Sequence, residues 1–232
     1  MPSTRLTRER LRNHWQYGKW VYVVILAAAY FLGSMVYTMT AYRSPADRRV
    51  EFHVVTDRLR AVEPMQAIAQ GLLPEAQEYD PTLEVIDVIQ MMYSGDPETD
   101  MYGAQKFYTF IQAGEGNVYL LPEALMVQMA QTGGALELDA FIQSGALDVA
   151  GLDLSGVTFE EPVFDEDEDE TGAVTGAPRP THVYAIPCKH MARLAQEDTM
   201  LDIDNLYMVV MGYCKNPDTT AFVLNAFMEA TR

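Results

Sequence analysis

Residues 117–132 read NVYLLPEALMVQMAQT, and this stretch decides the fold class. Its first part, Asn117–Leu121, is short and almost wholly apolar, as expected of a strand buried in the middle of a sheet. Pro122 favours the first turn of a helix, and apolar residues then recur at helical spacing until Gly133 and Gly134. A buried strand followed directly by a helix is typical of a parallel sheet with helical crossovers.

The same order of strand and helix occurs twice before this stretch. EFHVVT at Glu51–Thr56 predicts a strand, and a helix beginning near Glu63 follows it. LEVIDVIQMMY at Leu83–Tyr93 predicts a second strand, and Met101–Ala113 has the apolar spacing of a helix. We therefore expect an α/β domain that forms a single three-layer lobe around a mostly parallel sheet.

The later part of the chain is less regular. THVYAIP at Thr181–Pro187 and NLYMVVMGYC at Asn205–Cys214 predict two more strands. Asn216 precedes a Pro and begins a last helix that we expect to end near Ala230. Between Gly151 and Pro180 the regular spacing fails, which predicts a loop.

The chain begins with a basic segment followed by a long apolar run. Trp20–Tyr42 contains no charged residue and exceeds the ~20 residues that a transmembrane helix needs. Five Lys or Arg residues precede this run and three follow it closely, so the charge bias predicts a cytoplasmic N-terminus. A cleaved secretory signal is the alternative, but the run is long, and bulky Met39 flanks the only candidate cleavage residues.

These features predict a single-pass protein of the cell membrane. We divide it into a short basic cytoplasmic segment (1–19), a transmembrane helix (20–42) and a linker (43–50). An extracytoplasmic α/β domain follows (51–232), and it contains an acidic loop (160–180).

Charge is divided unevenly between these parts. Residues 1–43 carry six basic residues and one acidic residue, hence +5, and the net charge of the whole chain is -17. The rest of the chain therefore carries -22. Such a domain would be repelled by nucleic acid phosphates, so we expect no nucleic acid partner.

Several segments resemble the first lobe of extracytoplasmic solute-binding proteins of the two-lobed periplasmic type. They are MQAIAQGLLPEAQEYDPTLEVIDV, FYTFIQAGEGNVYLLPEALMVQMAQTGGALELDAFIQ, HVYAIP and NPDTTAFVLNAFM. HVYAIP has Ala185 where that family usually has Gly. The family's second lobe is inserted about where this chain has only the residues after Pro187. The resemblance thus implies one solute-binding-like lobe.

The entry to the apolar run, with Trp15, Tyr17, Lys19 and Trp20, resembles that of small membrane-anchored proteins of Gram-positive bacteria. This second resemblance implies no biochemical activity.

Ligands of such sheets meet the carboxyl ends of the strands, so Asp57, Tyr93 and Glu123 are the candidate ligand-binding residues. The chain has no nucleophile elbow, phosphate loop or zinc-binding helix motif. We therefore expect a binding or interaction module rather than an enzyme, and no cofactor. Its candidate partner is a membrane or cell-surface protein such as a transporter. The alternative is a structural or assembly partner that keeps the fold without binding a ligand.

The two cysteines, Cys188 and Cys214, each follow a predicted strand. Outside the cytoplasm two such residues can pair, and we expect a disulfide between them. Two free thiols are the main alternative, and a metal site with His53 and His190 is another.

In the acidic loop, Asp165, Asp167 and Asp169 have the first spacing of a calcium-binding loop. That loop also needs Gly at its sixth position and Glu at its twelfth, where this chain has Glu170 and Gly176. A solvated loop and loose calcium binding both remain open.

Overall fold

The computed structural model describes residues 8–58, 60–162, 179–195 and 201–232. Most of the predicted acidic loop and its candidate calcium ligands therefore lie outside the described residues. The chain forms two compact units, residues 1–43 and 44–232.

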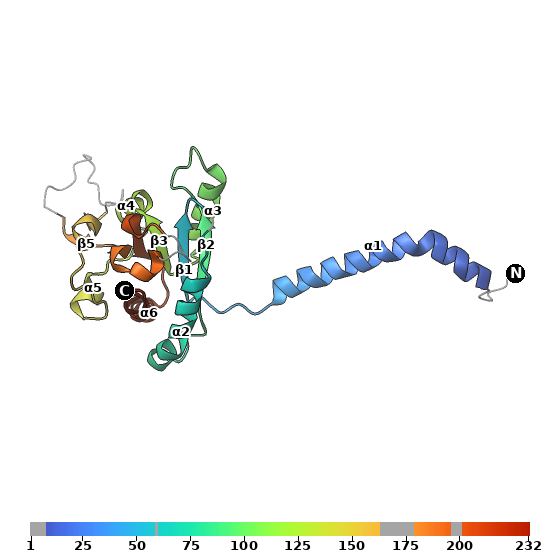
Figure 1. The fold of residues 1–232 in the computed structure, drawn as a ribbon, viewed down its shortest axis with the longest axis horizontal. Helices are drawn as coiled ribbons and strands as arrows, with labels where there is room; N and C mark the ends of the chain where they lie inside the picture. Colours follow the sequence, from blue (N-terminus) through green and yellow to red (C-terminus); the bar gives the residue numbers. More distant parts are fainter. Residues whose placement is uncertain (1–7, 59, 163–178, 196–200) are drawn as a thin grey trace, which may run out of the picture. The chain divides into compact units, whose positions relative to one another are not determined.

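The first unit is a single helix, α1 (Arg8–Thr40) (Figure 1). Its part Gly18–Thr40 is long and apolar enough to cross a membrane, judged by length and composition. The apolar side chains of this part are exposed within the structure.

The second unit is built on a five-stranded sheet in the order β2-β1-β3-β7-β6 (Figure 1). β1 pairs in parallel with both β2 and β3, whereas β7 is antiparallel to β3 and β6 is antiparallel to β7. The predicted α/β class with a mostly parallel sheet is confirmed. The strands of this sheet are β1 (Arg49–Thr56), β2 (Val85–Met92), β3 (Val118–Pro122), β6 (Ile186–Pro187) and β7 (Leu206–Val210).

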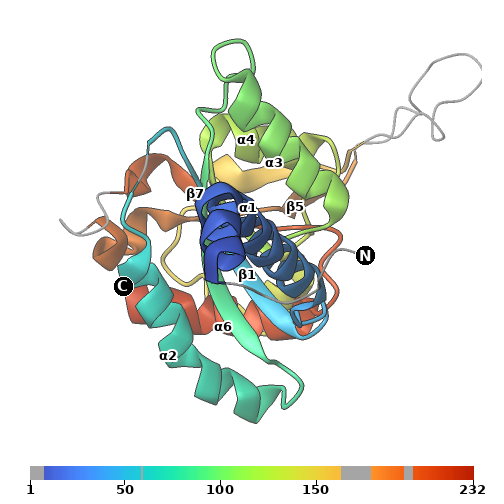
Figure 2. The same cartoon turned by 90° about the vertical axis from the view of Figure 1, so that its right-hand side faces the viewer.

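Helices cover both faces of the sheet (Figure 2). One face packs against α2 and α6, and the other packs against α3 and α4. A short helix, α5, follows α4. Their bounds are α2 (Glu63–Tyr79), α3 (Met101–Ala113), α4 (Glu123–Gln131), α5 (Asp139–Gln143) and α6 (Pro217–Thr231).

Strand β1 lies inside the sheet and is covered on both faces. Val50, Phe52 and Val54 belong to the apolar cluster beneath α2 and α6, where the Phe52 ring stacks on Phe227 at 4.8 Å between ring centroids. Val55 belongs to the cluster beneath α3 and α4. Because successive side chains point to opposite faces, Arg49, Glu51 and His53 share the second face with Val55.

The structure differs from the sequence prediction after residue 180. The predicted strand Thr181–Pro187 is two strands in different sheets, because β5 (Thr181–Val183) pairs with β4 (Thr158–Glu160) while β6 pairs with β7. β7 also ends earlier than predicted. Beyond it, the amides of Met211 and Gly212 donate to carbonyls in loops instead of to a neighbouring strand.

Strand β2 is an edge strand, and a side chain from α2 covers part of its edge. The Gln66 amide oxygen accepts a hydrogen bond from the Val88 N–H at 2.6 Å, and its nitrogen donates to the Ile86 carbonyl at 3.4 Å. Gln66 thus bonds the edge as a neighbouring strand would, which protects it from pairing with another chain.

We predict that Gln66→Ala destabilises the chain by about 1–2 kcal/mol, because it leaves the N–H of the buried residue Val88 without its acceptor. It should also increase self-association through the freed edge. Denaturant unfolding and sedimentation of the full chain in micelles measure both effects. Gln70→Ala, at an exposed position of the same helix, is the matched control. A Gln66 variant as stable and as monomeric as the control would contradict this role.

Candidate functional site

A cleft of about 440 Å³ lies at the carboxyl ends of the parallel strands. Residues that follow β1 and β2 form one side of it, and residues that lead into β7 form the other. Its lining consists of Val55, Thr56, Asp57, Arg58, Arg60, Ser94, Pro122, Leu201, Asp202, Asn205 and Leu206.

The turn after β1 is fixed by its own hydrogen bonds. The Thr56 hydroxyl donates to the Arg58 carbonyl at 2.8 Å, and the Gln90 amide donates to both of these oxygens at 3.2 and 3.1 Å. Asp57 and Arg58 form an ion pair at 3.3 Å, but both side chains are exposed, so this pair contributes little stability. These bonds connect Thr56 and Arg58 to Gln90 of β2 at this rim.

Arg60 differs from the other arginines of this unit. Five of the seven arginines after residue 43 form ion pairs with carboxylates, and Arg193 donates to the Ala230 carbonyl. Within the described residues, Arg60 has no such partner, although it is half-buried and lines the cleft. Among the residues that the structure describes, this is therefore the arginine best placed to meet an anionic group from outside.

The three predicted ligand-binding residues lie in different environments. Asp57 lines the cleft. Tyr93 is fully buried with its ring 5.5 Å from that of Phe107, and burial with the nearby Tyr108 hydroxyl raises its pKa to about 12. Glu123 is exposed at the start of α4, outside the cleft lining. A ligand-binding role for each of the three stays a prediction.

The sequence reasoning missed Arg60, Asp202 and Asn205. The last two residues reach the cleft because β7 is antiparallel to β3, which brings the amino end of β7 to the carboxyl edge of the parallel strands. Pairing direction was not specified by the pattern of residues 205–214. Arg60 could have been singled out as one of only ten basic residues after residue 43.

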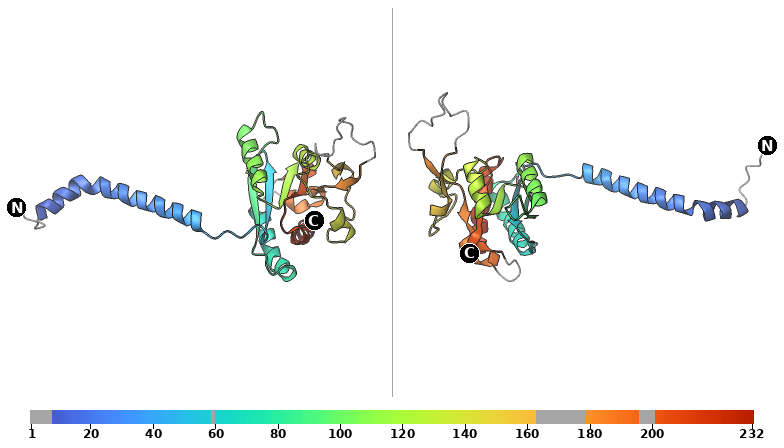
Figure 3. Two further views of the ribbon diagram at one scale, coloured as in Figure 1. Left: turned by 180° about the vertical axis from the view of Figure 1, so that it is seen from behind. Right: turned by 90° about the horizontal axis from the view of Figure 1, so that it is seen from above.

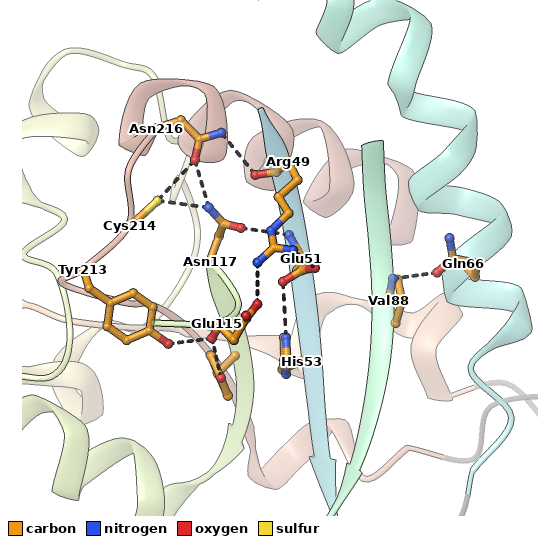
Figure 4. A network of polar contacts seen from close by, with 11 residues as sticks. Arg49, Glu51, His53, Gln66, Val88, Glu115, Asn117, Tyr213, Cys214 and Asn216 are labelled. Atoms are coloured by element: carbon orange, nitrogen blue, oxygen red, sulfur yellow. Dashed lines mark hydrogen bonds and ion pairs between the residues drawn. The ribbon is translucent and has the colours of Figure 1, made fainter. Parts of the chain in front are cut away.

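A second group of polar residues lies toward the other end of β1 (Figure 4). Arg49, Glu51 and His53 alternate along one face of the strand. Glu51 lies 3.3 Å from the Arg49 guanidinium and 3.8 Å from Nε2 of His53, and Arg49 also pairs with Glu115. A row of polar side chains thus lies on the face of β1 that packs against α3.

Asn117 joins this row to the neighbouring elements. Its side-chain oxygen accepts a hydrogen bond from the Glu51 N–H at 3.0 Å, and its nitrogen donates to Oδ1 of Asn216 at 2.8 Å. Asn216 in turn donates to the Arg49 carbonyl at 3.2 Å. These bonds tie the beginnings of β1, β3 and α6 together (Figure 4).

His53 is fully buried, and its ring stacks on Tyr119 with 4.6 Å between ring centroids. Within the described residues neither ring nitrogen has a hydrogen-bond partner, and the Glu51 carboxylate is the nearest charged group. Burial by itself raises the pKa of Glu51, but the contacts with His53 and Arg49 outweigh it and hold that pKa below its ordinary value. This arrangement keeps Glu51 ionised, and its contacts are those of a structural network.

The predicted disulfide is wrong, because Cys188 and Cys214 are both free thiols. Cys188 follows Pro187, which pairs with Tyr207 near the beginning of β7, whereas Cys214 lies beyond the end of that strand. Cys188 is buried in the apolar cluster beneath α2 and α6, and burial raises the pKa of its thiol.

The metal-site alternative finds no support at these cysteines. Asn117 donates to the sulfur of Cys214 at 3.4 Å, so this thiol belongs to the polar network. Within the described residues, no three His, Cys, Asp or Glu side chains are grouped so that they could hold a metal ion.

Gly116 is required by the packing of His53. Its φ is +82°, and a Cβ atom there would lie 2.5 Å from the His53 ring and 2.9 Å from the Tyr119 ring. Both rings are fully buried and cannot move aside easily.

We predict that Gly116→Ala lowers the free energy of unfolding by about 2–4 kcal/mol, through overpacking added to backbone strain. Gly145→Ala is the matched control, since Gly145 has a similar φ of +77° but open space around it. The control should cost only about 1–2 kcal/mol. Denaturant unfolding of both chains measures the difference, and equal losses would show that the contact with His53 is unimportant.

No protein-family model matches this chain, and no curated protein matches it. Among solved structures, it is similar to Extracellular solute-binding protein family 1 from Alicyclobacillus acidocaldarius subsp. acidocaldarius DSM 446. The sequence identity is 13% and the TM-score is 0.31; the match covers 64% of this chain and 32% of that one. The similarity is loose, and most of that protein has no counterpart in the match.

Proposed function

We propose that this chain is a membrane-anchored, non-catalytic binding module with α1 as its anchor. The second unit would bind a small molecule in the cleft at the carboxyl ends of β1, β2 and β3. The observation that carries this proposal is Arg60, a half-buried arginine that has no carboxylate partner among the described residues and lies in a cleft with polar lining. A cleft of about 440 Å³ is also within the usual size range of small-molecule sites.

The cleft favours a ligand with an anionic group. A guanidinium matches the planar geometry of a carboxylate and can bond both of its oxygens. Asn205 and Ser94 also line the cleft and can donate hydrogen bonds to further ligand oxygens. Asp57 and Asp202 would disfavour a second anionic group and would accept bonds from a donor.

Binding by this unit alone should be weak. Two-lobed binding proteins gain affinity by enclosing the ligand, which removes water and strengthens each polar contact. A single lobe contacts only one side of the ligand, so we expect a Kd of roughly 0.1–1 mM, about 4–5.5 kcal/mol. Tighter binding would need a second surface, supplied by another copy or by a membrane partner such as a transporter.

A structural or assembly role is the second candidate, and one observation favours it. Met101 and Tyr102, at the start of α3, are 79% and 80% exposed, and Met92, at the end of β2, is 47% exposed. Large apolar side chains so exposed are common where proteins meet. A structural or assembly role requires no ligand in the cleft.

The ligand proposal predicts selective loss of binding on Arg60→Gln. Ligand-observed NMR with the full chain in nanodiscs should detect small carboxylates at millimolar concentration. Arg60→Gln should weaken that binding about 10-fold or more, the value of a charge-assisted hydrogen bond. Arg48→Gln is the matched control, because Arg48 pairs with Glu84 outside the cleft lining. Absence of any binder in a panel of carboxylates, amino acids and sugars would refute the binding module and favour the assembly role.

The orientation of the anchor is a separate prediction from the charge bias around it. A cysteine substituted for Ser3 should be shielded from an impermeant thiol reagent in intact cells, whereas one substituted for Thr171 should react. The unaltered chain, with Cys188 and Cys214, gives the baseline labelling. The reverse pattern would place the second unit inside the cell.

A further inference from the structure

The N-terminal part of α1 carries basic and aromatic residues along one face. Arg8, Arg12, Trp15, Lys19 and Tyr22 follow one another at intervals of four and three residues in a continuous helix. At 3.6 residues per turn, all five lie within an arc of about 80° around the helix axis. The side chains of the three basic residues, named here the basic stripe, are all exposed.

The basic stripe begins outside the segment that can span the membrane. That segment starts at Gly18, ten residues after Arg8, which corresponds to about 15 Å along a helix. The 23 residues from Gly18 to Thr40 are themselves about 35 Å long, enough for the ~30 Å of hydrocarbon. The first turns of α1 would therefore lie at the level of the lipid headgroups. Figures 1 and 3 show α1 bending in this part, in darkest blue.

Aromatic residues fix the depth of this face. The rings of Trp15 and Tyr22 are stacked with 6.4 Å between their centroids, and they lie on either side of Lys19 along the helix. Such amphipathic rings favour the boundary between headgroups and hydrocarbon. They would hold the guanidinium groups of Arg8 and Arg12 on the water side of that boundary, at the depth of the lipid phosphates.

Basic residues outnumber acidic ones around the basic stripe. Glu9 is the only acidic residue before residue 47, against five basic residues before residue 20. Within the described residues, neither Arg8, Arg12 nor Lys19 forms an ion pair. Three exposed cations on one face are thus available to anions in the surroundings.

We propose that the basic stripe binds the headgroups of anionic phospholipids in the leaflet that surrounds the N-terminal end of the span. Each basic residue near an anionic lipid surface is expected to favour binding about fivefold, corresponding to ~1 kcal/mol. Arginine also bonds a phosphate with two parallel hydrogen bonds. Because the binding site is one face of the helix, the affinity for anionic lipid depends on where each basic residue lies around the helix as well as on the number of charges.

The two tryptophans of the chain, Trp15 and Trp20, make this proposal measurable with the full chain. We suggest reconstituting it in vesicles of phosphatidylcholine and phosphatidylglycerol, with a nitroxide quencher on the upper acyl chain of one lipid or the other. Labelled phosphatidylglycerol should quench the tryptophan fluorescence more than labelled phosphatidylcholine at the same fraction. The difference should shrink in 1 M NaCl, where the screening length is about 3 Å.

The variant that tests the face is Arg8→Gln/Arg12→Gln, which should lower the preference for phosphatidylglycerol about fivefold or more. Arg8→Gln/Arg10→Gln is the matched control, because it removes the same charge but one of its residues lies about 160° away from the basic stripe. This control should keep more of the preference. Equal quenching by the two lipids in the unaltered chain, or equal losses in the two double variants, would overturn the proposal.

Discussion

The parallel pairing of β1 with both β2 and β3 is the constraint on which the rest of the second unit depends. It brings the carboxyl ends of three strands to one edge of the sheet, where the backbone must turn into helices. That edge therefore collects loop residues, and the cleft forms there. The same pairing brings the amino ends of β1 and β3 together at the other edge. Arg49 and Asn117 meet near that edge because of it, through Glu51 and Asn216.

The polar row of Arg49, Glu51 and His53 on β1 destabilises a strand inside a sheet, because burying charged groups removes their hydration. Glu51 and Arg49 offset that cost with each other and with Glu115. For His53, the gain from its contacts is smaller than the cost of burying its ring nitrogens. An unsatisfied buried polar group costs about 1–3 kcal/mol, while aromatic stacking returns only about 0.5–1.5 kcal/mol. The Glu51 carboxylate lies 3.8 Å from Nε2 of His53, and a small movement would make it a hydrogen-bond acceptor for that nitrogen. It is therefore the group best placed to offset the rest of this cost.

Local signals in the sequence predicted most of the helices and strands. They did not predict the features that depend on pairing between strands far apart in the chain. Helix α3 has the predicted bounds because its ends are locally encoded: the Asp100 side chain accepts from the Gly103 N–H, and Gly114 has a left-handed conformation. The direction of β7 depends instead on pairing with β3, which lies more than eighty residues earlier. That direction places Asn205 at the cleft. It also separates Cys188 from Cys214, which a prediction from strand ends alone could not foresee.

The charge of the second unit sets how an anion could reach the cleft. A unit with a formal charge of -22 repels anions at long range, but this repulsion is screened over about 8 Å at physiological ionic strength. Within that distance, the local arrangement of charges decides the sign of the interaction. Arg58 is already paired with Asp57, so Arg60 is the residue that can attract an anion, provided that the anion lies nearer to Arg60 than to Asp202, which also lines the cleft. A cleft open to water weakens that attraction through its high dielectric constant. Closure by a second surface would therefore raise affinity even if it contributed no direct contact with the anion.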